Sequence, residues 1–110
     1  AKTVASAVTQ LSIGELMDVK LSECFSPDVE SYMQMIYQKT ASLIEATAAS
    51  AALLAGKDEK VYGTYGRNLG LAFQIIDDIL DVTQTSEQLG KPAMHDFEEG
   101  KTTLPYIYLY

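Results

Sequence analysis

The 110-residue sequence contains a single cysteine and few basic residues. Because Cys24 has no second cysteine with which to form an intrachain disulfide, the sequence fits a reducing compartment, and we expect a cytoplasmic location. Eight basic residues against 15 acidic ones give a net charge of -7, so no basic stripe can neutralise a row of nucleic-acid phosphates. An acidic chain can still bind a phosphorylated small molecule when a divalent cation bridges the two.

Long apolar runs and targeting signals are also absent. The most apolar stretch, residues 43–54, is shorter than the roughly 18 residues that cross a bilayer, and Glu45 interrupts it. The sequence does not begin with Met and shows no basic start followed by an apolar core, so no secretory signal is visible. We therefore expect no transmembrane segment, and the hydrophobic content of 47% is sufficient for a core.

Strand signals are missing as well, because period-two alternation occurs only at residues 106–110. The sequence therefore predicts an all-α fold. A first helix is expected over about residues 2–20, and its apolar residues are spaced for one buried face. These residues are Val4, Val8, Leu11 and Leu16.

A second helix has clear start and stop signals. Ser26 suits the N-cap, Pro27 the first helical position and Asp28 the first turn. The helix should run to Ala55, because Gly56 readily adopts the left-handed conformation that ends helices.

A third helix is expected from Asp58, its N-cap, to about residue 82 or 83. It carries Gly63, Gly66 and Gly70 on one broad face, although each glycine costs about 1 kcal/mol relative to alanine inside a helix. Close approach of another helix, or space for a ligand, would each explain these glycines.

The polar residues 84–100 predict a long loop, of the kind that is often functional. A last helix is expected to open near Thr102 or Thr103, with Pro105 in its first turn.

An acidic stripe runs along one face of the third predicted helix. At about 100° per residue its side chains share one face, opposite an apolar face that includes Ile76 and Ile79. The stripe consists of Gln74, Asp77, Asp78 and Asp81. Carboxylates this close repel one another, and Mg²⁺, which typically takes one or two carboxylates together with water and phosphate oxygens, would offset the repulsion. The pattern alone also fits a solvated acidic face, where salt screens the repulsion.

Three lysines favour a diphosphate site over a merely acidic surface. Lys39 is followed by Thr40, and a lysine beside a hydroxyl can hold a phosphate oxygen by charge and hydrogen bond. Lys91 lies in a Gly-Lys-Pro turn, and Lys101 comes directly before the last helix, whose N-terminal dipole favours an anion. Each lysine considered alone is typical of a solvated surface residue. Together with the acidic stripe, the three lysines predict a site for Mg²⁺ and diphosphate.

Four motifs, in this order, resemble those of trans-isoprenyl diphosphate synthases, especially the bacterial long-chain polyprenyl diphosphate synthases. The motifs are Ile13-Gly14-Glu15-Leu16, Lys39-Thr40, Phe73-Gln74 followed by Asp77-Asp78-Ile79-Leu80-Asp81, and Gly90-Lys91-Pro92 with Glu99-Gly100-Lys101-Thr102. The resemblance covers nearly the whole chain. It implies that residues 1–110 are the C-terminal part of a polyprenyl diphosphate synthase domain, a portion of the isoprenoid synthase helical bundle that lacks the half with the first aspartate-rich motif.

The resemblance also implies roles for single residues. Those that would hold the allylic diphosphate and take part in catalysis are Lys39, Thr40, Gln74, Lys91 and Lys101. Those that would bind Mg²⁺ are Asp77, Asp78 and Asp81. Phe73 would lie beside the isoprenoid or the incoming isopentenyl diphosphate.

The implied activity is elongation of an allylic diphosphate with isopentenyl diphosphate to a polyprenyl diphosphate, by a synthase whose family is typically homodimeric. An alternative from another class is a non-catalytic helical regulatory subunit of a heteromeric synthase, which would not need to keep the acidic stripe and the lysines. A terpene cyclase would share the chemistry of metal and diphosphate without keeping Phe73-Gln74 together with the Gly-Lys-Pro turn. Arg67, the sole arginine, is expected to be an ordinary surface cation.

Overall fold

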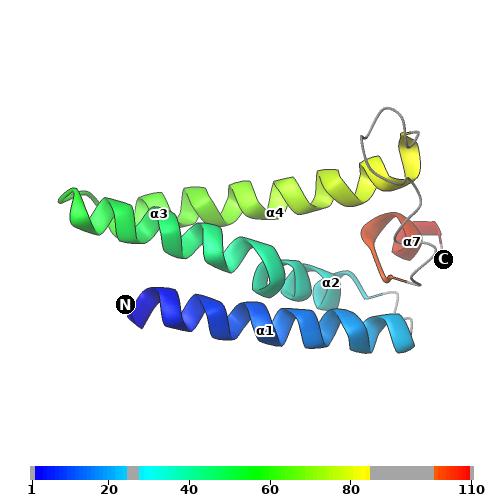
Figure 1. Cartoon of the computed structure of the whole chain (residues 1–110). Helices are drawn as coiled ribbons and strands as arrows, with labels where there is room; N and C mark the ends of the chain where they lie inside the picture. Colours follow the sequence, from blue (N-terminus) through cyan, green and yellow to red (C-terminus); the bar gives the residue numbers. More distant parts are fainter. Residues whose placement is uncertain (1, 25–27, 85–100, 110) are drawn as a thin grey trace.

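The computed structural model describes residues 2–24, 28–84 and 101–109, and within them every regular element is a helix (Figure 1). The helices are α1 (Lys2–Glu23), α2 (Val29–Ile36), η1 (Tyr37–Ala41), α3 (Ser42–Leu54), α4 (Glu59–Thr83) and α7 (Leu104–Leu109). The predicted all-α fold is thus confirmed. None of these helices is long and apolar enough to span a membrane. The predicted loop lies outside the described residues except for Gln84.

Helix α1 has the predicted position, but the prediction of its buried face was wrong except at Leu11, which is partly buried. Val4, Val8 and Leu16 are exposed, and Leu16 keeps 72% of its surface in contact with solvent. The buried residues are instead Ala7, Gly14, Asp18 and Leu21. Small residues lie on this face because the neighbouring backbone comes close: a Cβ on Gly14 would lie 2.7 Å from the Cα of Lys39. The sequence pattern selected the larger apolar side chains, whereas the close approach of η1 leaves no room for a side chain at Gly14.

The second predicted helix consists of three helical elements that follow one another without a break, α2, η1 and α3. Asp28 is the N-cap, not a first-turn residue, because its Oδ1 accepts a hydrogen bond from the backbone N–H of Glu30 at 3.1 Å. Ser26 and Pro27 lie outside the described residues. The predicted end is confirmed, since Gly56 adopts φ 70° directly after the C-cap Ala55.

Helix α4 lies alongside α3 and runs in the opposite direction (Figure 1). Asp58 caps it as predicted, accepting from the N–H groups of Lys60 at 3.0 Å and Val61 at 3.4 Å. A Cβ on Gly66 would lie 2.8 Å from the carbonyl oxygen of Ile44, and one on Gly70 would lie 2.7 Å from the Cα of Ala41. Close helix packing therefore explains these two glycines.

The apolar core gathers at the end of the bundle where α7 packs (Figure 1). Its buried residues are Leu21, Tyr32, Met35, Ile36 and Ile107. The hydroxyl of Thr102, ahead of α7, donates a hydrogen bond to the carbonyl of Leu21 at 2.8 Å. Helix α7 begins at Leu104 with Pro105 in its first turn, as predicted. This packing brings Lys101 to α1, where its Nζ lies 2.7 Å from Oδ2 of Asp18, 83 residues away in the sequence.

Candidate functional site

The acidic stripe of α4 faces the interior of the described structure. Asp78 and Asp81 are only 5% and 3% exposed, and Asp77 is half-buried, whereas Ile76 and Ile79 on the opposite side are exposed. A solvated acidic face is thereby excluded for Asp78 and Asp81. Burying carboxylates is costly unless charges or hydrogen bonds compensate them, so the groups around the stripe determine what it can do.

A chain of hydrogen bonds fixes the start of the stripe. Gln74 donates from Nε2 to Asp78 Oδ1 at 3.0 Å and to Asp77 Oδ2 at 3.5 Å. Thr40 donates from Oγ1 to Gln74 Oε1 at 2.9 Å. The hydroxyl of Tyr32, which is fully buried in the core, donates to Asp78 Oδ2. The amide of Gln74 thus joins η1 to the carboxylates of α4, and both oxygens of Asp78 are oriented.

The π-helical element η1 presents Lys39 and Thr40 to this network. Short π-helical stretches within α-helices frequently occur at functional sites. On the other side of η1, Gln38 donates from Nε2 to Gln10 Oε1 of α1 at 3.1 Å, and Gly14 lies against its backbone. The backbone that carries Lys39 is therefore held between α1 and α4.

A buried carboxylate from α1 joins two of the predicted lysines. Asp18 Oδ2 accepts from Lys39 Nζ at 2.9 Å and from Lys101 Nζ at 2.7 Å, and Asp18 is only 2% exposed. Burial by itself raises the pKa of Asp18, but the hydrogen bonds and positive charges of Lys101 and Lys39 outweigh it and hold the pKa below its usual value. Three separate segments of the chain meet in this cluster.

A cavity of about 170 Å³ contains most of the predicted site. The residues that line it are Asp18, Met35, Ile36, Lys39, Gln74, Asp77, Asp78, Lys101 and Thr103. Lysines, carboxylates and an amide therefore converge from α1, η1, α4 and the segment before α7. Thr40 does not line the cavity but reaches it through Gln74.

Besides Thr40, two predicted site residues in the described ranges do not line this cavity. Asp81 is buried on α4 but is not among the lining residues. Phe73 is 62% exposed and likewise does not line it. Lys91 lies outside the described residues.

Sequence reasoning missed Asp18 and Tyr32. Asp18 follows Gly14 by four residues, so the two share a face of α1, and a carboxylate beside a glycine on one face was the available signal. The sequence around Tyr32 gives no indication of a functional role, because a tyrosine on the apolar face of a helix is typical of an ordinary core residue.

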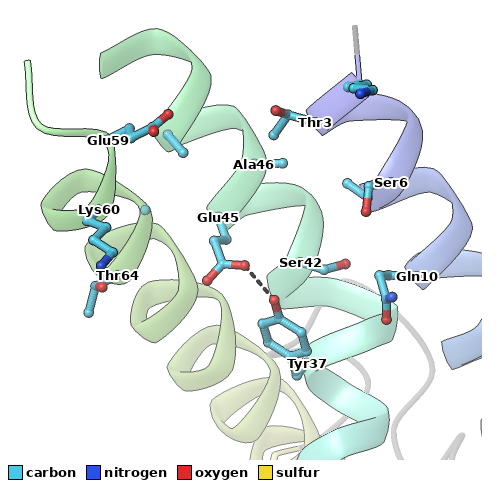
Figure 2. A pocket seen from close by; sticks show the side chains of 14 residues that line it. Thr3, Ser6, Gln10, Tyr37, Ser42, Glu45, Ala46, Glu59, Lys60 and Thr64 are labelled. Carbon is cyan, nitrogen blue, oxygen red and sulfur yellow. Dashed lines mark hydrogen bonds between the residues drawn. The ribbon is translucent and has the colours of Figure 1, made fainter. Parts of the chain in front are cut away.

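A second, larger cavity of about 660 Å³ lies between α1, α3 and α4 (Figure 2). Within it the hydroxyl of Tyr37 donates to Glu45 Oε1, and this hydrogen bond raises the pKa of Tyr37, helped by partial burial. Arg67 lies over the Tyr37 ring, 5.7 Å from its centre, which is close enough for a cation–π interaction. Arg67 is exposed as expected, but it is also paired with an aromatic ring, which the sequence did not indicate.

The side chains of the smaller cavity fit a metal ion that a phosphorylated ligand shares. Within the described ranges, no group of three or more His, Cys, Asp or Glu side chains is arranged to hold a metal ion. This excludes a closed cage built from those residues. Mg²⁺, however, usually takes only one or two carboxylates and completes its shell with water and phosphate oxygens. Asp77 and Asp78 place two carboxylates on the cavity, and Lys39 and Lys101 place two ammonium groups on it.

The described elements are helices, and they place lysines and aspartates around one cavity, as the resemblance to isoprenoid synthases implies. The family model described as polyprenyl synthetase matches residues 1–110 of the chain. The chain therefore belongs to the polyprenyl synthetase family.

Curated relatives and solved structures agree with this assignment. The chain is 44% identical to octaprenyl diphosphate synthase from Escherichia coli (strain K12), over 97% of the chain and 34% of that protein. Octaprenyl pyrophosphate synthase from Helicobacter pylori matches with a TM-score of 0.91 and 51% identity, over 99% of this chain and 36% of that one. A polyprenyl synthase from Caulobacter crescentus CB15, solved with calcium and isoprenyl diphosphate, matches with a TM-score of 0.91 and 38% identity, over 97% and 34%. The chain thus spans about a third of the length of these relatives.

Proposed function

We propose that this chain forms the second metal-and-diphosphate half-site of a prenyltransferase that elongates an allylic diphosphate with isopentenyl diphosphate to a polyprenyl diphosphate. The observation that carries the proposal is the cavity in which Lys39, Lys101, Gln74, Asp77 and Asp78 converge. Relatives named octaprenyl and solanesyl diphosphate synthases support it. The Caulobacter crescentus enzyme, which was solved with calcium and isoprenyl diphosphate, supports a divalent cation beside a diphosphate.

Each group of residues has a distinct task in this proposal. Lys39 and Lys101 neutralise and hold the oxygens of the allylic diphosphate, with Lys91 as a third cation from the sequence. Thr40 and Gln74 orient the ligand and the carboxylates through their shared hydrogen bond. Mg²⁺ would be held by Asp77 and Asp78, with Asp81 one turn further along α4, and when bound it supplies charge stabilisation for the leaving diphosphate.

The lysines act where negative charge develops. When the allylic C–O bond breaks, its electron pair leaves with the diphosphate, and an allylic cation remains. Lys39 and Lys101 stabilise the departing anion from fixed positions, so little reorganisation is needed as the charge appears. The double bond of isopentenyl diphosphate then forms the new C–C bond, and loss of a proton, taken up by the released diphosphate, restores a double bond. Phe73 would contact the isoprenoid from the exposed side of α4.

The test is incorporation of radiolabelled isopentenyl diphosphate by the full-length protein that contains these residues. Replacing both carboxylates, Asp77→Ala with Asp78→Ala, should abolish elongation and any stimulation by Mg²⁺. A Glu23→Ala, Glu30→Ala variant removes the same charge from exposed positions outside the cavity and should remain active. Elongation that persists in the double aspartate variant contradicts the metal assignment. The 110-residue chain on its own should be inactive, and robust turnover by it contradicts the half-site.

We further infer a homodimeric, cytoplasmic enzyme. The resemblance to the synthase family supports the dimer, and a single cysteine that is free and exposed supports a reducing compartment. Light scattering on the purified full-length protein tests the dimer, and a monomer at micromolar concentration contradicts it.

A further inference from the structure

The carboxylate of Asp18 lies behind the two lysines that the proposed function assigns to the diphosphate. We propose that Asp18 is a positioning residue: it holds the ammonium groups of Lys39 and Lys101 in the arrangement that binds the allylic diphosphate. This inference rests on the proposed function and adds Asp18 to the residues that serve it. Asp18 acts through the lysines, so it is not itself a catalytic residue.

The geometry makes Asp18 the meeting point of the two cations. One of its oxygens, Oδ2, accepts from both Nζ atoms, which come from positions 21 and 83 residues away in the sequence. A lysine side chain is flexible and presents three N–H donors, so a bond to Asp18 fixes the ammonium group without using all of its donors. The ammonium groups can therefore donate to diphosphate oxygens while they remain bound to Asp18.

The charge of Asp18 matters as well as its hydrogen bonds. Two ammonium groups that lie within 3 Å of the same oxygen repel each other, and a carboxylate between them offsets that repulsion. Asp18 is itself buried, so its charge is poorly screened by solvent. Among the described residues that line the cavity, the other acids are Asp77 and Asp78, which lie on α4 and are proposed to face the metal, whereas Asp18 supplies negative charge from α1.

The backbone around Asp18 supports the same role. Gly14, one turn earlier on α1, lies against the backbone of Lys39, so α1 contacts both the main chain and the side chain of this lysine. On the other side of the cluster, the hydroxyl of Thr102 donates a hydrogen bond to the carbonyl of Leu21 in α1. Thr102 directly follows Lys101, so this hydrogen bond also fixes the backbone next to Lys101. Contacts with helix α1 thus hold both lysines in position.

A purely structural role, in which Asp18 only ties three segments together, makes a different prediction. A structural tie would lower stability and leave the substrate constants of the folded enzyme unchanged. A positioning residue alters the constants of the ligand that the lysines hold, and only while those lysines are present.

The experiment compares the Asp18→Asn variant of the full-length enzyme with wild type, because asparagine keeps the size of the side chain and removes its charge. We expect kcat/KM for the allylic diphosphate to fall about 10- to 100-fold, the loss that typically follows removal of a supporting partner behind ligand-binding groups. The KM for isopentenyl diphosphate should stay within about twofold, since the lysines hold the other substrate. Glu23→Gln, which removes one exposed negative charge from the same helix, should behave as wild type.

A double-mutant cycle separates the two roles. In a Lys39→Met, Lys101→Met background, Asp18→Asn should cause no further loss of kcat/KM beyond about twofold. An equal loss with and without the lysines, or an unchanged kcat/KM for the allylic diphosphate in Asp18→Asn, overturns the proposal. If Asp18→Asn alone does not fold, the triple variant should recover the helical circular dichroism spectrum; failure of both variants to fold overturns the positioning role in favour of a structural one. A wild-type enzyme without any elongation activity would instead refute the proposed function.

Discussion

The contact between Gly14 and η1 gives a sharp prediction about how the site is held. Replacing Gly14 with alanine adds a Cβ that would lie 2.7 Å from Lys39 Cα and 2.8 Å from the carbonyl carbon of Gln38. Both atoms belong to the backbone, so no flexible side chain can move aside, and α1 must shift away from η1. Overpacking of this kind costs about 1–3 kcal/mol, and several backbone contacts at once place Gly14 at the upper end of that range.

Alanine also has an intrinsic advantage over glycine of about 1 kcal/mol inside a helix, which opposes the clash. The net expectation for Gly14→Ala is a decrease of roughly 1–2 kcal/mol in the free energy of unfolding, on the scale of overpacking costs. The same shift displaces Lys39 relative to Asp18, so kcat/KM for the allylic diphosphate should fall as well.

Urea denaturation of the full-length protein, followed by circular dichroism, measures this difference. Gly63→Ala is the matched control, because a Cβ there would lie 3.4 Å from Ala49 Cβ, 3.8 Å from Glu45 Cγ and 4.0 Å from the carbonyl oxygen of Glu45, which are ordinary contacts. That variant should be as stable as wild type or more stable by up to about 1 kcal/mol. If Gly14→Ala is stabilised to the same extent as Gly63→Ala, the close approach of α1 and η1 is refuted.

Two further predictions concern the polar network. Tyr32→Phe removes the hydroxyl that donates to the buried Asp78, so the free energy of unfolding in urea should fall by about 1–3 kcal/mol, and an unchanged value would show that this hydrogen bond does not support the carboxylate. Because the pKa of Asp18 is lower in the folded than in the unfolded protein, its ionised form stabilises the fold fully above the unfolded pKa of about 4, and this contribution is lost as the pH falls through the folded value. The stability advantage of wild type over Asp18→Asn should therefore be constant from pH 7 to pH 5 and shrink below pH 4, and an advantage that grows with acidity would contradict the ion pairs.

The helices that carry the site could be predicted from local signals. Asp58 and Gly56 act as expected because capping and left-handed conformations depend on a few adjacent residues. The acidic stripe of α4 was recognised from helical spacing alone. Its burial was not, because exposure depends on which elements pack against that face.

What the sequence did not reveal depends on contacts between distant segments. No residue pattern in η1 predicts its π-helical form. The role of Asp18 depends on two lysines that are distant in the sequence and that the fold brings within hydrogen-bond distance of it. The wrong face predicted for α1 has the same origin. Larger apolar residues indicate burial in general, but here η1 approaches so closely that it leaves no room for a side chain at Gly14, and the buried face also carries Ala7, Asp18 and Leu21.

Binding of inorganic pyrophosphate to the full-length protein, followed by titration calorimetry with and without MgCl₂, tests the central claim most directly. We predict that wild type binds pyrophosphate at least about tenfold more tightly with Mg²⁺ than without it, because two carboxylates and the anion share the cation. The Asp77→Ala, Asp78→Ala variant should lose this dependence, while the control variant at Glu23 and Glu30 should keep it. Equal affinity of wild type with and without Mg²⁺, or an unchanged dependence in the double aspartate variant, would contradict the metal-and-diphosphate half-site.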